Sequence, residues 1–258
     1  MKSILSDISG LLLDLDGVVY VGQQVLEGAV ETINFIKAKN IPCRFTTNTT
    51  VRSAASLHQK LIGLGLPVEE SEIFSALKAT VRYLRDRGRP SCYLLLTEDP
   101  IRDFSEFPVS DTSPDYVVIG DVGKYWDYEL VNKVFRMVMN GAQMIALHKG
   151  KYWQTETGLQ VDMGAFVAGL EYVTGQEATV IGKPSPSFFK LALDDLGLPA
   201  DRVAMVGDDI DSDVGGAQAA GLKGVLVKTG KYRKELVEVS RVKPNLVIES
   251  IGSLRDLC

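Results

Sequence analysis

The chain has 258 residues, 45% of them hydrophobic, which is enough to bury one large core or two smaller ones. Its net charge of −5 and the lack of a basic stripe argue against nucleic-acid binding. No apolar run approaches the roughly 18 residues of a membrane-spanning helix, and the N-terminal segment lacks a signal-peptide pattern. Cys43, Cys92 and Cys258 are scattered, so we expect no disulfide framework and a cytoplasmic protein.

Short apolar runs alternate with segments of helical periodicity along the chain. The predicted strands cover residues 10–13, 42–46, 92–96, 116–119, 143–147, 203–206 and 224–227. The predicted helices cover residues 29–39, 53–64, 75–87, 128–140, 165–174, 187–196 and 217–220. Strands that alternate with helices predict an α/β fold, in which parallel sheets carry helices on their faces.

The middle of the chain differs from the rest in its strand ends. Residues 78–182 keep the alternation but lack the polar groups that follow strands elsewhere. This difference favours a second α/β unit inserted into the first, and Gly182-Lys183-Pro184 marks the point of return. We therefore expect a core built from residues 1–77 and 183–258, and an inserted unit over residues 78–182.

The first predicted strand ends on two carboxylates. Asp14 and Asp16 follow the apolar run Leu11-Leu12-Leu13, and Gly17 comes next at a predicted turn. Open α/β sheets bind their ligands at the carboxyl ends of their strands. Two acids held this close are electrostatically costly unless a cation or a shared proton relieves them. The pair therefore indicates a metal site.

Three other segments carry polar groups at positions that a sheet edge can bring together. They are Thr47-Asn48, Lys183, and the acidic loop that begins at Asp208. If these segments converge, Asp14 and Asp208 supply the oxygen ligands that suit Mg²⁺. The Thr47 hydroxyl, the Asn48 amide and the Lys183 ammonium then bind phosphate oxygens. With Asp16 to move a proton, these are the parts that phosphoryl transfer requires.

Each segment also has a structural interpretation when taken alone. An Asp-x-Asp pair in a loop is commonly a turn or a helix cap, and Thr47 and Asn48 fit the same role. Lys183 alone fits a surface lysine. The phosphoryl-transfer hypothesis therefore depends on all four segments together.

Two competing motifs fail at specific positions. An EF-hand calcium loop over the acidic segment needs Gly and Glu where Val214 and Ala220 stand. A Walker A loop ending at Lys183 needs Gly where Glu177 stands, and Ser or Thr where Pro184 stands. Neither a calcium loop nor a nucleotide loop of these types is expected.

In this order, the four segments resemble the motifs of the haloacid dehalogenase-like hydrolase superfamily. Asp14-x-Asp16-Gly17 matches the nucleophile motif, Thr47 the second, Lys183 the third, and the loop over 207–213 the fourth. The spacing resembles the type IIA subgroup, which implies a Rossmann-like parallel-sheet core with a large inserted α/β cap domain. The chain looks most similar to the branch that contains phospholysine phosphohistidine inorganic pyrophosphate phosphatase and haloacid dehalogenase-like hydrolase domain-containing protein 2.

The resemblance implies the reacting groups. Asp14 would be the nucleophile and form an aspartyl-phosphate. Asp16 would protonate the leaving group and then activate water. Asp14, Asp208 and the backbone carbonyl of Asp16 would ligate Mg²⁺.

The resemblance also implies the supporting groups. Thr47 and Lys183 would bind the phosphoryl group, with Asn48 beside it. Asp213 would help to hold the metal-ligating residues in position without ligating the metal itself. Asp209 would be a further neighbour of these residues.

Taken together, the resemblance implies an Mg²⁺-dependent phosphoric monoester hydrolase of small phosphorylated compounds, with P–N bonds and pyrophosphate as further substrates. It also implies a homodimer. Three alternatives stay open: a catalytically weak phosphate-binding or regulatory protein, a phosphotransferase, and a dehalogenase, which would use no metal. His148, in the inserted unit, is either a substrate-facing group or a hydrogen-bonded structural residue.

Overall fold

The computed structural model describes residues 7–155 and 158–256, so the N-terminal segment used for the signal-peptide prediction, and Cys258, lie outside it. The chain forms two compact units. Unit 1 comprises the described residues up to Thr47, residues 57–75, and those from Lys183 onward, while unit 2 comprises residues 48–56 and 76–182. Over the described ranges, no helix is long and apolar enough to cross a membrane.

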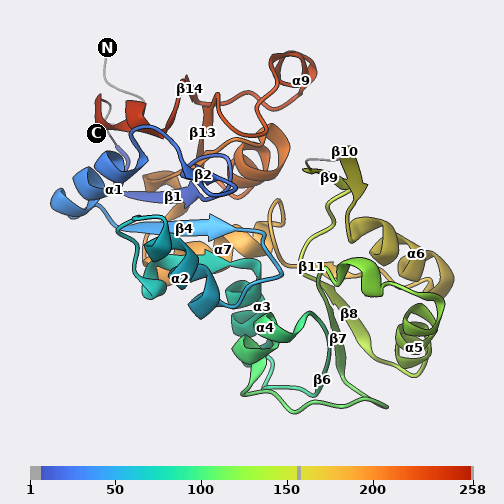
Figure 1. The fold of residues 1–258 in the computed structure, drawn as a ribbon. Helices are drawn as coiled ribbons and strands as arrows, with labels where there is room; N and C mark the ends of the chain where they lie inside the picture. Colours follow the sequence, from blue (N-terminus) through green and yellow to red (C-terminus); the bar gives the residue numbers. More distant parts are fainter. Residues whose placement is uncertain (1–6, 156–157, 257–258) are drawn as a thin grey trace. The chain divides into compact units, whose positions relative to one another are not determined.

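Unit 1 is built on a six-stranded parallel sheet in the order β14-β13-β12-β1-β4-β5 (Figure 1). Its strands are β1 (Gly10–Asp14), β4 (Cys43–Thr47), β5 (Ile73–Ser75), β12 (Val203–Gly207), β13 (Lys223–Val227) and β14 (Leu246–Ile248). A small antiparallel hairpin joins β2 (Tyr20–Val21) to β3 (Gln24–Val25). Its helices are α1 (Ala29–Ala38), α2 (Ala54–Gly63), α7 (Pro186–Leu196), α8 (Gly216–Ala219) and α9 (Lys234–Val239).

The central strand β1 is buried at all five positions, so both faces of the sheet are covered. On one face, Leu11 and Leu13 belong to a core that includes Ile33 of α1 and Leu61 of α2. On the other face, the π-helical turn η5 (Ile210–Gly215) packs against β12 and β13. The short helical turns of this unit are η1 (Glu70–Glu72), η4 (Ala200–Arg202) and η6 (Ile251–Asp256).

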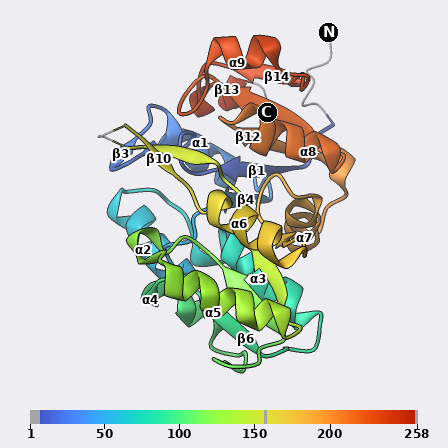
Figure 2. The same ribbon diagram turned by 90° about the vertical axis from the view of Figure 1, so that its right-hand side faces the viewer.

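Unit 2 has its own four-stranded parallel sheet in the order β11-β8-β7-β6. Its strands are β6 (Cys92–Leu95), β7 (Tyr116–Ile119), β8 (Gln143–Ala146) and β11 (Thr179–Val180), with a separate antiparallel hairpin of β9 (Tyr152–Thr155) and β10 (Gly158–Val161). Its helices are α3 (Ala76–Arg85), α4 (Glu98–Ile101), α5 (Tyr128–Met139) and α6 (Gly164–Thr174), and its short turns are η2 (Arg102–Phe104) and η3 (Gly123–Tyr125). Helices α5 and α6 lie side by side (Figures 1 and 2) and bury Val134 and Val167 with the sheet in one core.

The predicted α/β class with parallel sheets is confirmed. Each predicted strand and helix is present, with ends that differ by no more than two residues. The short strands β2, β3, β5, β11 and β14 were missed, because runs of two or three residues carry no periodicity. The hairpin of β9 and β10 and the short helices α4 and α9 were also not predicted. Unit 2 begins at residue 76 and also takes in 48–56, whereas the sequence predicted an insert over 78–182. The roles of the two units as catalytic core and cap stay predictions.

Candidate active site

Three of the predicted site residues lie at the carboxyl edge of the unit 1 sheet. Asp14 is the last residue of β1, Thr47 is the last of β4, and Asp208 directly follows β12. The strands are parallel and in register, with Asp14 opposite Thr46 and Leu13 opposite Val206. All three strand ends therefore lie at the same edge of the sheet, as predicted from the sequence.

Lys183 is buried between two carboxylates. Its ammonium donates to Oδ1 of Asp14 at 2.5 Å and to Oδ1 of Asp213 at 2.6 Å. Lys183 is 4% exposed and Asp213 is 2% exposed, so these charges are withdrawn from water. Lys183 is thus no surface lysine: it joins the nucleophile candidate to the acidic loop.

Asp208 completes a buried acidic cluster. One carboxylate oxygen from each of Asp14, Asp208 and Asp213 lies within 4.8 Å of the other two. The backbone N–H of Lys231 donates to Oδ2 of Asp208 at 2.6 Å, which fixes this carboxylate. Gly17 has φ +88°, and a Cβ there would lie 1.9 Å from the same oxygen. The glycine after the Asp14-x-Asp16 pair therefore makes room for Asp208.

The acidic loop folds so that one of its carboxylates turns back to the sheet. The Asp209 side chain caps η5 by accepting from the backbone N–H groups of Asp211 and Ser212. Asp213 Oδ2 accepts from the Asp209 N–H at 3.2 Å, and its other oxygen binds Lys183. A Cβ on Gly207 would lie 2.2 Å from the Cβ of Asp213, so only glycine allows this approach.

The charges of the cluster do not balance. Burial raises the pKa of Asp14 well above its usual range, although Lys183 opposes this shift. Burial, with the charge of Asp213, raises the pKa of Asp208 to about 7. Burial would lower the pKa of Lys183, but Asp14 and Asp213 outweigh it and raise that pKa. Three carboxylates facing one ammonium leave an excess of negative charge, and oxygen ligands of this kind fit a hard divalent cation such as Mg²⁺.

Asp16 lies on the water-exposed side of the same turn. Its backbone pairs with Tyr20, and the next residue, Gly17, donates its N–H to the Tyr20 carbonyl at 2.7 Å. Partial loss of hydration raises the pKa of Asp16, while the positive charges of Lys60 and Lys231 lower it. A carboxyl group with a raised pKa in an accessible position is suited to carrying a proton.

The remaining predicted residues have different surroundings. Thr47 is buried at the end of β4. Asn48 follows it but belongs to unit 2, so a role beside the phosphoryl group stays a prediction. His148 Nδ1 accepts from the Gly150 N–H at 3.0 Å, which supports the structural interpretation of that histidine. The other histidine, His58, contacts the Val68 carbonyl through Nε2 at 3.1 Å.

Two lysines near the site were not singled out from the sequence. Lys60 lies in α2, where a lysine on a helix carries no chemical signal. Lys231 lies in the loop that follows β13, four residues after its last residue, Val227, and this position beyond a strand end was the signal that could have identified it. Both act electrostatically on Asp16.

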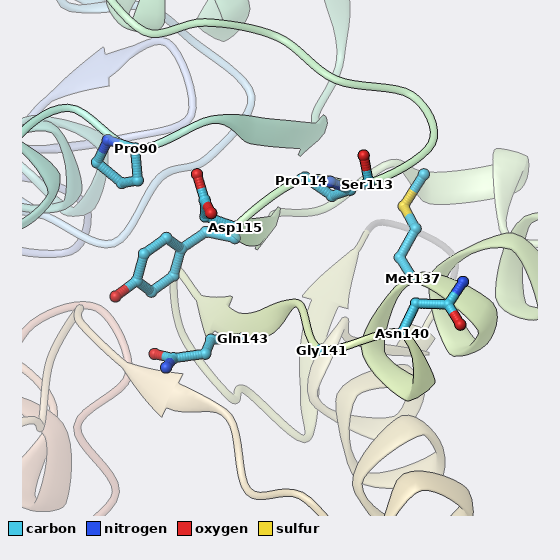
Figure 3. Close-up of a pocket in the computed structure, with 9 residues that line it drawn as sticks. Pro90, Ser113, Pro114, Asp115, Met137, Asn140, Gly141 and Gln143 are labelled. Atoms are coloured by element: carbon cyan, nitrogen blue, oxygen red, sulfur yellow. The ribbon is translucent and has the colours of Figure 1, made fainter.

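A cavity of about 530 Å³ lies in unit 2 at the amino ends of its strands (Figure 3). Tyr116 and Gln143, the first residues of β7 and β8, line it together with Asp115. The Asp115 carboxylate already accepts from the N–H and the hydroxyl of Ser91. None of the predicted site residues lines this cavity.

Family models match both arms of unit 1. Residues 11–107 match the model described as haloacid dehalogenase-like hydrolase, and residues 180–254 match one described as HAD-hydrolase-like. Haloacid dehalogenase-like hydrolase domain-containing protein 2 from Bos taurus is 38% identical over 94% of this chain and 93% of its own length. Phospholysine phosphohistidine inorganic pyrophosphate phosphatase from Bos taurus is 39% identical over 98% of this chain and 95% of its own length.

Solved structures are similar over almost the whole chain. The 4-nitrophenylphosphatase of Thermotoga maritima has a TM-score of 0.92 at 30% identity, covering 98% of each chain. The p-nitrophenyl phosphatase of Archaeoglobus fulgidus has a TM-score of 0.92 at 31% identity, covering 98% of this chain and 100% of that one. The fold of this chain is therefore closely similar to those of known phosphatases.

Proposed function

This chain belongs to the haloacid dehalogenase-like hydrolase family, and from that premise we propose that it is an Mg²⁺-dependent phosphatase of small phosphorylated compounds that works through an aspartyl-phosphate. The observation that carries the proposal is the buried cluster of Asp14, Asp208, Asp213 and Lys183 at the carboxyl edge of the sheet. The family membership gives the reaction class, and the cluster supplies groups suited to it.

Asp14 and Asp208 would hold Mg²⁺ through carboxylate oxygens, together with the backbone carbonyl of Asp16, and Asp213 supports them. When bound, the ion offsets negative charge on the phosphoryl group and on the carboxylates. The donor set fits this ion, because it consists of hard oxygen ligands with an excess of negative charge. Burial and the nearby charge of Asp213 raise the pKa of Asp208. The same buried, closely spaced carboxylates are what would bind the divalent ion.

The chain's own residues account for the covalent steps. A carboxylate oxygen of Asp14 attacks phosphorus; the bond from phosphorus to the leaving oxygen breaks, and the acyl-phosphate bond forms. Asp16 gives its proton to the leaving oxygen. It then takes a proton from water, which attacks phosphorus, releases phosphate and restores the Asp14 carboxylate.

Lys183 and Thr47 would hold the oxygens of the transferred phosphoryl group, with Asn48 beside them. Lys183 also keeps Asp14 in place, because its contact at 2.5 Å fixes one oxygen of that carboxylate. Positioning and charge stabilisation of this kind lower the barrier of phosphoryl transfer.

We further propose that unit 1 is the catalytic core and unit 2 the cap that selects substrates. The named substrates of the relatives, phospholysine, phosphohistidine, pyrophosphate and nitrophenyl phosphate, are candidates for this chain. Cytoplasmic location and pairing of two copies stay predictions from composition and from the resemblance.

The test is release of phosphate from p-nitrophenyl phosphate by the wild type and by Asp14→Asn, with and without Mg²⁺. We expect turnover only with Mg²⁺, and a loss of about 10³-fold or more in kcat for Asp14→Asn, because the nucleophile is removed. Asp211→Asn is the matched control, since Asp211 is an exposed carboxylate of the same loop outside the cluster.

Equal activity of Asp14→Asn and the wild type would exclude Asp14 as the nucleophile. Tight binding of phosphate esters without turnover across a broad panel would favour a regulatory protein instead. Product that appears only with an added acceptor would favour a phosphotransferase.

A further inference from the structure

Two ammonium groups lie near Asp16 that the mechanism above does not use. They come from separate elements of unit 1: Lys60 from α2, and Lys231 from the loop after β13. Both exert a positive potential on the Asp16 carboxyl. In the proposed reaction, this carboxyl marks where the leaving group is protonated, so the charge of the two lysines acts on the leaving group.

Lys60 is held in place by an aromatic ring. Its ammonium lies 3.9 Å from the centroid of the Tyr20 ring, a cation–π contact. Tyr20 is itself paired through its backbone with Asp16. The lysine, the ring and the carboxylate are therefore held at one turn, although α2 is distant from that turn in sequence.

Lys231 is held by its backbone rather than by its side chain. Its N–H binds Asp208 at 2.6 Å, and the neighbouring Thr229 hydroxyl donates to the Gly17 carbonyl at 2.5 Å. The Thr229 bond ties the loop to the turn that carries Asp16, and the Lys231 bond ties it to Asp208. The Lys231 side chain is 71% exposed and its ammonium lies 3.7 Å from Asp209, so its head is in water and within reach of a ligand.

We propose that Lys60 and Lys231 form a specificity-determining pair for leaving groups that carry a second anionic group, a carboxylate or a further phosphate. This inference depends on the proposed phosphatase function. Lys183 hydrogen-bonds to two buried carboxylates and would bind the transferred phosphoryl group, whereas Lys60 and Lys231 act electrostatically on Asp16, the proposed proton carrier. A second negative charge on the leaving group would meet both ammonium groups, while a neutral leaving group would gain little from them.

The experiment compares meta-carboxyphenyl phosphate with phenyl phosphate. A meta carboxylate changes the reactivity of the leaving phenol little, so the ratio of the two kcat/KM values reports recognition of charge. We expect the wild type to favour the carboxylated ester by about 10-fold or more, and Lys60→Met and Lys231→Met each to reduce that ratio by about fivefold. Lys60→Arg and Lys231→Arg should restore much of it. Lys228→Met is the control, because Lys228 lies in the same loop as Lys231 but pairs with Glu249, which follows β14.

Two inhibitors distinguish a phosphate from a carboxylate as the second group. Methylenediphosphonate should bind more tightly than methylphosphonate to the wild type, measured by calorimetry with Mg²⁺ present, and the Met variants should lose that advantage. If the wild type prefers the charged member only among the phosphonate inhibitors, the lysine pair recognises a second phosphate. If it prefers the charged member only among the esters, the pair recognises a carboxylate.

The pair is excluded if the wild type shows no preference in either arm, or if the Met variants lower both members of each comparison equally. It is also excluded if Lys228→Met has the same effect. If neither ester is turned over, the proposed function fails, and the calorimetric comparison alone decides on the lysine pair.

Discussion

Lys183 shows how one buried residue holds the site together. Lysine is almost never fully buried unless it is paired, and here it is paired twice, with Asp14 and with Asp213. Its ammonium is the positive charge that directly hydrogen-bonds to two of the three carboxylates of the cluster. Removing it would leave carboxylates withdrawn from water without a counter-charge, a cost larger than the loss of a surface ion pair.

We therefore predict that Lys183→Met lowers the free energy of unfolding of the metal-free protein by about 3–5 kcal/mol, measured by urea denaturation. Lys228→Met, which breaks the exposed pair with Glu249, should cost about 0–1 kcal/mol. If both variants lose a similarly small amount of unfolding free energy, the negative charge of the buried carboxylates is compensated in another way, for example by protonation.

At the scale of elements, burial explains which strands could be predicted. Residues 10–13 and 203–206 are continuous apolar runs because β1 and β12 are buried on both faces of the sheet. Strand β5 consists of three residues after an acidic turn, so it becomes a strand only by pairing with β4. The π-helical turn η5 was not foreseen either, since wide turns of this kind depend on tertiary contacts rather than on periodicity.

In the candidate site too, some positions follow from the local sequence and others depend on tertiary contacts. Asp14, Thr47 and Asp208 could be placed from the sequence, because parallel strands end at a common edge. The hydrogen bond from Lys183 to Asp213 could not be predicted, because it depends on how the loop after β12 folds back toward the sheet. Lys60 and Lys231 were missed because their relation to Asp16 arises only from the packing of α2 and of the loop after β13.

Gly207 permits the close contact between β12 and η5. A side chain at this position would place its Cβ 2.2 Å from the Asp213 Cβ and 2.4 Å from an Asp213 oxygen. Gly207→Ala should therefore displace Asp213, with a loss of about 1–3 kcal/mol of stability and a larger relative loss of Mg²⁺-dependent turnover. Urea denaturation and phosphate release measure the two effects.

Gly63→Ala is the matched control, because a Cβ at the end of α2 meets nothing within 4 Å. Alanine there should leave stability unchanged or raise it by about 0.4–1 kcal/mol. If Gly207→Ala retains wild-type turnover, the position of Asp213 is not important for the reaction.

At the scale of the whole molecule, each unit has its own hydrophobic core and its own buried thiol. Cys43 lies in β4 of unit 1 and is 5% exposed, while Cys92 lies in β6 of unit 2 and is 0% exposed. Burial raises the pKa of Cys43 to about 11 and that of Cys92 to about 12. In the folded protein at pH 8 both thiols keep their protons, and only unfolding exposes them and returns their pKa to about 8.5.

Alkylation of the two thiols should therefore report the unfolding of each unit separately. Because Asp14, Asp208 and Asp213 all belong to unit 1, Mg²⁺ should stabilise that unit alone, by about 2.7 kcal/mol at a concentration 100 times the Kd. Pulsed alkylation in increasing urea, read by peptide mass, should show the Cys43 midpoint rising with Mg²⁺ while the Cys92 midpoint moves less. Asp208→Asn should abolish the Cys43 shift. Equal midpoint shifts at both thiols would mean that the two units unfold together. If Mg²⁺ does not shift the Cys43 midpoint, Mg²⁺ does not bind at the cluster.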